Sequence, residues 1–543
     1  MYSESKNFSS KDIWAFWIAC VLIAVLIQLY TLDVLPHLQQ DEAQITEYGR
    51  LVLDPESNWS INWRLEEKKP LLLWSYLGPL IAESSFHIWG GSGIGTRIAS
   101  ILGAVLAATM AFGWLLSRDV VKYAAFGLSL AFLLDPLFVL SQRMGRVDSW
   151  VIALCLGCCW LIRFSKYKNE KQKRLLIPLC GGIAATAALV WPSAIFLLPL
   201  IFLELIQSAP TKVEKRGKWK IVGKRFLLFG LGGFITTVLL LLPILDNLVL
   251  ILSDSSAMIS GNIDASKSAE SRFLSFFSKD SWFKLIKALI KTWTPFFPML
   301  ALAGIIICRK SKLIIAFLAA LVLIFASLVY EFRVLYLLPY FMVLSSGLFL
   351  NGKVKTYKKW INKTAGISLG LLLFWAVFIS LGLRTSLGAK VKSEKDRNKI
   401  LSMATNSIGA GDYNVYLDFT YEFYFAGRSL GWNLYTPYIQ YSQDEQGNWI
   451  RQNDHQPEKD FLKLLADMDY ALFYEYMVTP DLEKQITSSG LVEKQVFDLD
   501  TESEPIAKDR SRNEEILLYF LRGREKYGSF ILYSRMNSLN SSL

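Results

Sequence analysis

The sequence predicts a polytopic α-helical membrane protein followed by a small α/β domain, and three observations lead to this fold class. Of the 543 residues, 52% are hydrophobic and the mean hydropathy is positive, whereas soluble domains average about 45–50% apolar residues. The apolar residues occur in runs of about 17–25, the length that spans a bilayer core. From about residue 385 onward the polarity is ordinary, and strand-like segments alternate with helix-like ones.

The length rule predicts about eleven membrane spans. The first apolar run is longer than the apolar part of a secretory signal and no small-residue cleavage site follows it, so we expect it to be retained as a span. The predicted spans are residues 13–32, 94–117, 121–141, 148–165, 175–191, 193–209, 226–247, 291–307, 313–330, 332–350 and 364–383.

Basic segments predict which ends of these spans face the cytoplasm. The formal net charge is +11, and much of it lies in short stretches between spans, where Lys and Arg mark the cytoplasmic side. Nucleic-acid binding is an alternative role for basic runs, but their positions in interspan loops favour topology, so no nucleic-acid partner is predicted. The stretches are residues 163–174, 212–225, 308–312 and 351–363.

A further apolar stretch, residues 71–90, is predicted not to cross the membrane. A Gly-Pro pair interrupts it and it carries Glu83. If it crossed, every later basic loop would fall on the outer side, against the positive-inside rule. We therefore expect residues 41–54 and 71–89 to form helices that lie along the outer surface.

The same parity places the loop after the first span, residues 142–147, residues 248–290 and the tail from residue 385 on the outer side. The sequence FLSFFSKDSWFKLIKALIKTW, which begins within 248–290, has apolar residues at helical spacing and lysines on the other side. We expect this amphipathic helix to cover the bundle at the outer surface.

Two domains are predicted: a transmembrane domain at residues 1–384 and an extracytoplasmic α/β domain at 385–543. The second domain shows no Gly-rich phosphate-binding motif, and we expect it to cover the bundle or position an acceptor. Thr479 followed by Pro is typical of a helix start. The predicted strands are residues 414–419, 470–476 and 530–535, and the predicted helices are 459–468 and 479–490.

Cysteine and histidine usage argues against two other classes of protein. All six cysteines lie in or beside apolar runs, so the sequence does not predict a disulfide framework. Only three histidines are present, which argues against a His-based metal site.

Charged residues gather at the predicted outer ends of the spans. Charges at a membrane boundary are costly unless they have a function or a partner, so their grouping on one side indicates a functional site. They are Asp41, Glu42, Glu67, Lys68, Arg97, Arg143, Arg146, Asp148, Glu331 and Arg333.

These residue types suit transfer of a group from an anionic lipid. A carboxylate can accept the proton of an attacking hydroxyl, and Lys and Arg can bind a phosphate and stabilise its departing charge. Simpler roles stay open for each residue. Asp41 is a favourable helix N-terminal residue, Arg143 and Arg146 can pair with lipid headgroups, and Arg97 can extend toward the interface.

Five stretches resemble motifs of the GT-C membrane glycosyltransferases, in particular the superfamily of dolichyl-phosphate-mannose protein mannosyltransferases and lipid A aminoarabinose transferases. They follow one another in the family order over roughly residues 13–350. The first and fourth are the most specific. The stretches are DEAQITEYGR (41–50), EKKPLLLW (67–74), GTRIASILGAV (95–105), SQRMGRVDSWVIAL (141–154) and FRVLYLLPYF (332–341).

The resemblance implies two catalytic acids and a set of substrate-binding residues. Asp41 would be the catalytic carboxylate that faces the acceptor, and Asp148 the second acid. The substrate-binding residues would be Glu42 beside Asp41, Glu67 and Lys68 at the donor phosphate, Arg97 of the third motif, Arg143 and Arg146 in the phosphate pocket, and Arg333 and Tyr336 from the late spans.

The implied function is transfer of a sugar from a polyprenyl-phosphate donor to an acceptor on the extracytoplasmic face, with inversion at the anomeric carbon. The acceptor would be a glycolipid, a glycan or a protein, and the enzyme a multi-pass protein of the plasma (inner) membrane and cell envelope. No metal site is predicted outright. A divalent cation held by Asp41, Glu42 and Asp148 is an additional hypothesis, because all three supply hard oxygen ligands.

Two other classes of function compete with glycosyl transfer. A lipid or small-molecule transporter or flippase would also be polytopic, but such proteins carry ionisable groups near mid-depth and often show paired halves, features that this sequence lacks. A non-catalytic assembly protein with an exterior binding domain is the third class, and it predicts that Asp41→Asn is harmless.

Overall fold

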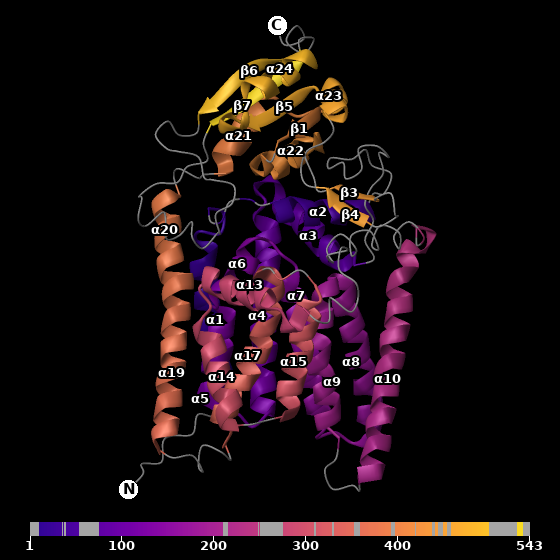
Figure 1. Cartoon of the computed structure of the whole chain (residues 1–543), viewed down its shortest axis with the longest axis vertical. Coiled ribbons are helices and arrows are strands. Elements are labelled where there is room, and N and C mark those ends of the chain that lie inside the picture. The colour runs from indigo at the N-terminus through magenta and orange to yellow at the C-terminus, as the bar shows by residue number, and fades with distance from the viewer. Residues whose placement is uncertain are drawn as a thin grey trace.

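The described part of the chain is a bundle of apolar helices with a mixed sheet at one end (Figure 1). We refer to that end as the sheet-facing end of the bundle. Glu67 and Lys68 lie outside the described residues. The computed structural model describes residues 10–34, 36, 38, 40–53, 75–209, 215–247, 249, 275–308, 311–327, 329, 331–351, 359–392, 397–418, 420–436, 440–443, 449–452, 458–498 and 529–535.

Each of the eleven segments predicted as a span is helical, but they differ in length. Among the described residues, seven helices can cross a membrane by length and composition, and an eighth candidate is a pair, Lys122–Leu133 and Pro136–Arg143, bent by 47°. The three shorter apolar helices are Pro192–Gln207, Phe296–Cys308 and Ser311–Phe325. The seven long ones are Lys11–Leu29, Ile94–Ser117, Asp148–Ser165, Glu170–Val190, Trp219–Asp246, Phe332–Phe349 and Trp360–Ala389.

The helical region consists of α-helices and short 3-10 or π turns, labelled η. In chain order these are α1 (Ser10–Leu29), α2 (Gln40–Leu53), α3 (Leu77–Trp89), η1 (Gly90–Ser92), α4 (Ile94–Ser117), α5 (Lys122–Leu133), α6 (Pro136–Arg143), α7 (Asp148–Ser165), α8 (Glu170–Val190), η2 (Pro192–Leu197), α9 (Leu198–Gln207), α10 (Lys215–Leu241), η3 (Leu242–Asn247), η4 (Ser275–Phe277), α13 (Lys279–Lys291), α14 (Phe296–Cys308), α15 (Ser311–Phe325), α16 (Glu331–Val334), η5 (Leu335–Leu337), α17 (Leu338–Ser346), η6 (Gly347–Phe349), α19 (Lys359–Val377), η7 (Phe378–Leu383) and α20 (Arg384–Val391).

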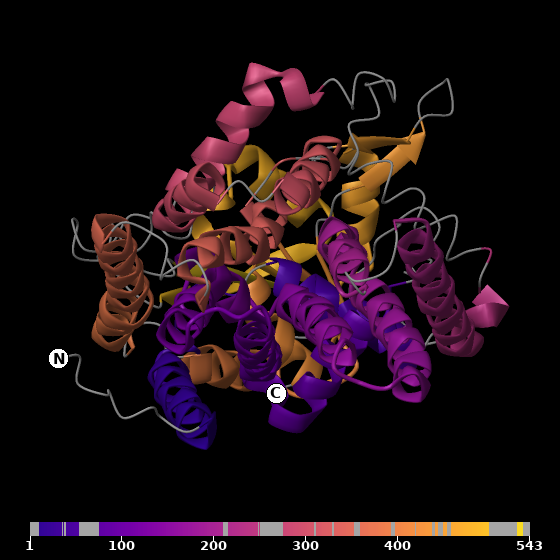
Figure 2. The same cartoon turned by 90° about the horizontal axis from the view of Figure 1, so that it is seen from below.

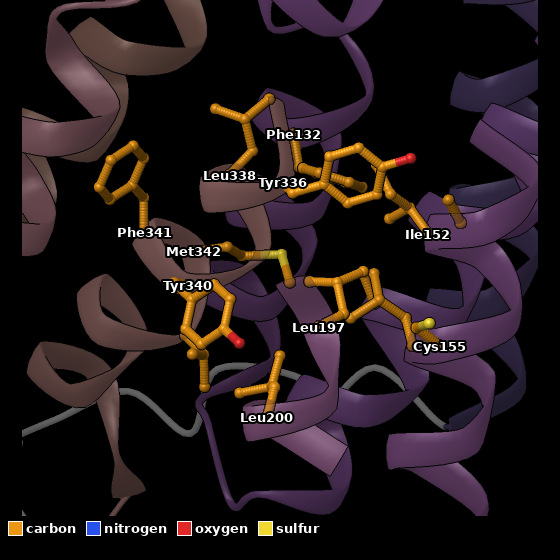
Figure 3. Packing of buried hydrophobic residues seen from close by; sticks show 14 of the residues in the cluster. Phe132, Ile152, Cys155, Leu197, Leu200, Tyr336, Leu338, Tyr340, Phe341 and Met342 are labelled. Carbon is orange, nitrogen blue, oxygen red and sulfur yellow. The ribbon is translucent and has the colours of Figure 1, made fainter. Parts of the chain in front are cut away.

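The span Phe332–Phe349 occupies the centre of the bundle. In its most apolar stretch 94% of residues are buried, whereas only 11% are buried in the corresponding stretch of Trp219–Asp246. Helices α10 and α19 lie on opposite flanks of the bundle (Figures 1 and 2). Figure 3 shows Tyr336, Tyr340 and Met342 of this span among apolar side chains of neighbouring helices. The Tyr340 hydroxyl donates to the Phe196 carbonyl at 2.8 Å, which satisfies a polar group inside an apolar core.

Glycine allows α8 and α10 to approach closely. A Cβ at Gly181 would lie 1.9 Å from the Phe229 carbonyl oxygen, and one at Gly232 would lie 2.0 Å from that of Pro178. Small residues at such contacts are typical of membrane helices, whose association depends on close packing.

Two short helices, α2 and α3, lie between the bundle and the sheet (Figure 1). Helix α3 has 13 residues, which at about 1.5 Å per residue is shorter than a bilayer core of about 30 Å. Its length is consistent with the surface position that the parity of the basic loops predicts for this stretch. The two helices cross at Gly49, where a Cβ would lie 2.1 Å from the Pro79 carbonyl oxygen.

Helix α13 is the predicted amphipathic segment. Leu285 and Ala288 are buried, while Phe283 is 67% and Ile286 is 51% exposed. It lies at the sheet-facing end of the bundle (Figure 1), where large exposed apolar side chains suit a membrane interface.

A buried carboxylate ties three helices together at the opposite end of the bundle. Glu204 is fully buried; it accepts from Trp114 Nε1 at 3.0 Å and from Arg163 Nη1 at 3.0 Å, and it also pairs with Arg118. The sequence analysis did not single out this cluster, because its members are far apart in the chain.

The C-terminal region is α/β, as predicted. Its five-stranded sheet has the order β2-β1-β5-β7-β6; β1 is parallel to β2 and β5, whereas β7 is antiparallel to β5 and β6. The elements are α21 (Arg397–Ser407), β1 (Asn414–Leu417), η8 (Tyr421–Phe423), α22 (Tyr424–Leu430), β2 (Asn433–Tyr435), β3 (Gln440–Gln443), β4 (Trp449–Gln452), α23 (Glu458–Ala466), β5 (Tyr470–Tyr474), η9 (Glu475–Met477), α24 (Pro480–Ser488), β6 (Leu491–Asp498) and β7 (Ser529–Arg535).

All three predicted strands and both predicted helices of this region are present, as β1, β5, β7, α23 and α24. The Thr479 side chain accepts from the Leu482 amide at 3.3 Å and caps α24. The sequence analysis missed the strands β2, β3, β4 and β6. The boundary at residue 384 stays a prediction; it falls within the continuous helix Trp360–Ala389.

The Glu204 cluster leads to a stability prediction. We expect Glu204→Ala to lower the free energy of unfolding by about 3–5 kcal/mol, because two arginines would be left near one another without their shared carboxylate. Thermal unfolding in detergent would measure it. Glu170→Gln is the control, since this 80% exposed carboxylate pairs with Lys173 at the surface and its loss should leave the melting temperature unchanged. Equal melting temperatures for both variants would contradict the prediction.

Candidate active site

Residues from three distant parts of the chain meet at the sheet-facing end of the bundle. Asp41 is the second residue of α2, Asp148 is the first residue of α7, and Tyr336 lies in η5. An acid at the start of a helix is electrostatically favourable, so both carboxylates occupy positions that their helices support.

Arg146 connects these groups. Its Nε donates to Asp148 Oδ2 at 2.7 Å and its Nη1 contacts Asp41 Oδ2. The Tyr336 hydroxyl donates to the other oxygen of Asp148 at 2.7 Å. The ring of Phe332 lies 3.9 Å from Arg146 Cζ, over the face of the guanidinium. We call these residues, Asp41, Arg146, Asp148, Phe332 and Tyr336, the Arg146 network.

Asp41 and Asp148 differ in the solvent exposure of their side chains. The Asp41 side chain is 37% exposed, whereas those of Arg146 and Asp148 are 6% and 2% exposed. Asp148 already accepts hydrogen bonds on both oxygens. Of the two acids, Asp41 is therefore the one that a substrate can reach.

The loop before α7, which contains Gly145, positions Arg146 to contact Asp41 and Asp148. Gly145 has φ +60°, and a Cβ there would lie 2.8 Å from Thr96 Oγ1, so a side chain at this position would be both strained and crowded. The Ser100 hydroxyl donates to the Arg146 carbonyl at 2.6 Å and holds the loop against α4.

Glu42 and Arg97 form a separate, fully buried ion pair. Arg97 donates through Nε and Nη2 to the two oxygens of Glu42 at 2.9 and 2.7 Å, and through Nη1 to the Leu32 carbonyl at 2.7 Å. This bidentate geometry is the strong form of the Arg–carboxylate contact. It attaches the start of α2 to α4 and to the end of the first span.

Arg143 lies against the first span rather than between the acids. It is fully buried and donates to the Gln28 carbonyl at 3.0 Å, to Thr31 Oγ1 at 3.1 Å and to the Thr31 carbonyl. These contacts favour a positioning role for Arg143 over the direct phosphate contact that the resemblance implies.

Asp135, an acid outside the motifs, has a local structural role. Its side chain accepts from the amide of Leu137 at 3.0 Å and from Thr294 Oγ1 at 3.2 Å. It therefore caps α6, the helix that carries Arg143.

Arg333 and Lys68 are the remaining basic residues that were expected at the site. Arg333 is half-buried and adjoins Phe332 in α16, which places it beside the Arg146 network. Lys68, with its neighbour Glu67, belongs to the undescribed segment 54–74.

A second charged cluster was missed by sequence reasoning. Glu47 on α2 and Glu83 on α3 are both buried, and they meet Tyr424 and Arg428 of α22. The sequence shows an acid within each of these two helices, Glu47 and Glu83. Their partners Tyr424 and Arg428 could not be predicted, because they lie more than 300 residues away along the chain.

The donor set does not suit a divalent cation. A guanidinium lies between Asp41 and Asp148, and Glu42 is paired with Arg97. Within the described ranges, no group of three or more His, Cys, Asp or Glu side chains is placed to hold a metal ion. Arg146 supplies the positive charge between these acids.

Comparison with known proteins identifies the fold. The sequence matches no protein-family model, and no curated protein sequence matches it significantly. ArnT from Cupriavidus metallidurans bound to undecaprenyl phosphate has a similar structure, with a TM-score of 0.51 and 12% identity over 95% of this chain and 98% of ArnT. Apo ArnT gives a TM-score of 0.53 and 12% identity over 87% of this chain and 95% of ArnT.

A third similar structure is that of the mycobacterial arabinofuranosyltransferase AftD, with a TM-score of 0.46 over 95% of this chain and 41% of AftD. The two ArnT structures match this chain over most of the length of both proteins. The chain is a multi-pass membrane protein with the fold of the GT-C membrane glycosyltransferases.

Proposed function

We propose that this protein is a glycosyltransferase that moves a sugar from a polyprenyl-phosphate donor to an acceptor hydroxyl at the sheet-facing surface of the membrane. The observation that carries the proposal is the Arg146 network. One guanidinium contacts both Asp41 and Asp148, so acids separated by more than a hundred residues share one site at the boundary of the bundle.

Asp41 is the proposed general base. Its exposed carboxylate accepts the proton of the acceptor hydroxyl while the acceptor oxygen bonds to the anomeric carbon of the sugar. The bond between that carbon and the donor phosphate breaks in the same step, and the phosphate leaves with the electron pair. Attack from the face opposite the phosphate inverts the anomeric carbon.

Arg146 is the proposed electrostatic partner of the departing phosphate. A buried, fixed cation stabilises developing negative charge without reorganisation during the reaction. Asp148, Tyr336 and Phe332 hold its guanidinium in place, and Lys68 and Arg333 are proposed as further phosphate contacts. Arg97, Glu42 and Arg143 position α2 and the first span.

Chemistry and fold both support the proposed donor class. The ArnT structure holds undecaprenyl phosphate, and cations beside apolar helices suit a ligand with an anionic head and a long apolar chain. The acceptor is proposed to be a glycolipid, a glycan or a protein hydroxyl.

The proposed orientation puts the site and the C-terminal domain outside the cytoplasm at the inner membrane. At the opposite end of the bundle, Arg118 follows α4 and Lys122 begins α5. The connection between α7 and α8 carries Lys166 and Lys168. Basic short loops favour the cytoplasmic side.

The role of Asp41 leads to the central prediction. We expect Asp41→Asn to reduce sugar transfer by roughly 10²–10⁴-fold, the usual contribution of a general base. Purified protein in membranes would be incubated with radiolabelled polyprenyl-phosphate sugars and envelope extract, and labelled acceptor counted. Asp33→Asn is the matched control, because Asp33 lies in the connection that precedes α2 and does not belong to the Arg146 network. Full activity of Asp41→Asn would sink the proposed chemistry.

A finer prediction concerns the hydroxyl of Tyr336. Tyr336→Phe removes one hydrogen bond to an ionised group, worth about 1.5–3 kcal/mol, so we expect kcat to fall roughly 10- to 100-fold with little change in donor KM. Tyr340→Phe is the control, since its hydroxyl bonds a backbone carbonyl away from the acids. Similar kinetic losses in both variants would refute a specific role for Tyr336.

A third prediction follows from the position of Arg146 between the acids. Because the guanidinium supplies the positive charge there, we expect transfer to persist in excess EDTA. Restoration of lost activity by Mg²⁺ or Mn²⁺ after chelation would contradict this assignment.

A further inference from the structure

The C-terminal domain docks on the two short helices through α22. The ring of Phe425 fits against Gly93, where a Cβ would lie 2.3 Å from it, and Ser429 Oγ would lie 2.1 Å from a Cβ at Gly91. Phe425 and Phe86 have ring centroids 5.7 Å apart. This contact leaves no room for movement of α22 relative to the end of α3 without repacking.

Arg428 is the charged centre of this contact. It donates through Nη1 and Nη2 to the two oxygens of Glu83 at 2.9 and 2.7 Å, and its Nη1 lies 3.6 Å from Glu47 Oε2. Its Cζ is 4.6 Å from the Phe86 ring centroid. The Tyr424 hydroxyl donates to the same Glu47 oxygen at 2.6 Å.

All of these charges are desolvated. The side chains of Arg428, Glu47 and Glu83 are 6%, 0% and 1% exposed. Burial, together with the Glu47 charge, raises the pKa of Tyr424 well above its ordinary value, so the phenol stays a hydrogen-bond donor. Buried acids of this kind require their partner, and for Glu47 and Glu83 part of that partner set comes from the C-terminal domain.

Glu47 shares a helix with Asp41. The two residues are six positions apart on α2, which is about 9 Å along a helix axis. The helix is held at its start by the Glu42–Arg97 pair, in its middle by Glu47 and at Gly49 by its crossing with α3. The position of α2, and with it that of Asp41, therefore depends on contacts at three points along the helix.

We propose that Arg428 is a positioning residue through which the C-terminal domain fixes α2, and with it the Asp41 carboxylate, for the transfer step. The proposal rests on the proposed function of Asp41 and adds a role for the C-terminal domain. A displacement of a catalytic group by about 1 Å can cost roughly 100-fold in rate, so the attachment acts on catalysis more than on donor binding.

The test compares two arginines of the same domain. Arg428→Gln removes the guanidinium contacts with Glu83 on α3 and Glu47 on α2. Arg535→Gln instead removes hydrogen bonds to the Met468 and Leu465 carbonyls that stay within the domain. In the full-length protein, we expect Arg428→Gln to lower kcat about 10- to 100-fold with donor KM within about twofold. Arg428→Lys should recover part of the rate, because it restores the charge but not the bidentate geometry.

Hydrogen–deuterium exchange gives a readout that does not require activity. We expect Arg428→Gln to speed amide exchange in residues 40–53, and Arg535→Gln to leave that segment unchanged. Unchanged exchange in Arg428→Gln, or equal kinetic losses in the two variants, would overturn the proposal. If wild-type protein transfers no sugar while exchange still rises in Arg428→Gln, the attachment of α2 is supported and the proposed function fails.

Discussion

Pairing of buried charges is the constraint on which the sheet-facing end of this protein depends. A charge removed from water is tolerated only with an opposite charge or several hydrogen bonds around it. Arg97, Arg143, Arg146 and Arg428 each meet carboxylates or carbonyls from elements distant in sequence. These contacts join the first span, the two short helices, the α7 loop and the C-terminal domain into one assembly.

The same constraint distinguishes reactive groups from structural ones. Glu42, Glu47 and Glu83 are enclosed, and their charges are used to hold helices. Asp41 is paired yet remains 37% exposed, so it combines a fixed position with access to solvent. In the mechanism we propose, this division lets a rigid framework of ion pairs support one accessible base.

Much of the fold was predictable because hydropathy and length reflect the membrane directly. All eleven apolar segments are helical, and the interrupted stretch 71–90 forms the short helix α3. The lengths of the individual helices were less predictable. Helices α14 and α15 have only 13 and 15 residues, although each lies inside a longer apolar run. In the C-terminal domain β5 and β7 are buried, mainly apolar runs, whereas β2 has three residues and β6 mixes polar and apolar residues and is largely exposed.

The sequence by itself determined that charged motifs would lie at membrane boundaries, and it identified Asp41, Arg146, Asp148 and Tyr336 as members of one set. It could not assign partners, because an ion pair depends on distance in space and leaves no periodic signal along the chain. Arg143 and Arg146 belong to the same motif, yet they have different partners. In the tertiary structure Arg143 donates to the Gln28 carbonyl, whereas Arg146 contacts two carboxylates. The attachment of Arg428 to Glu83 across 345 residues was likewise decided by folding alone.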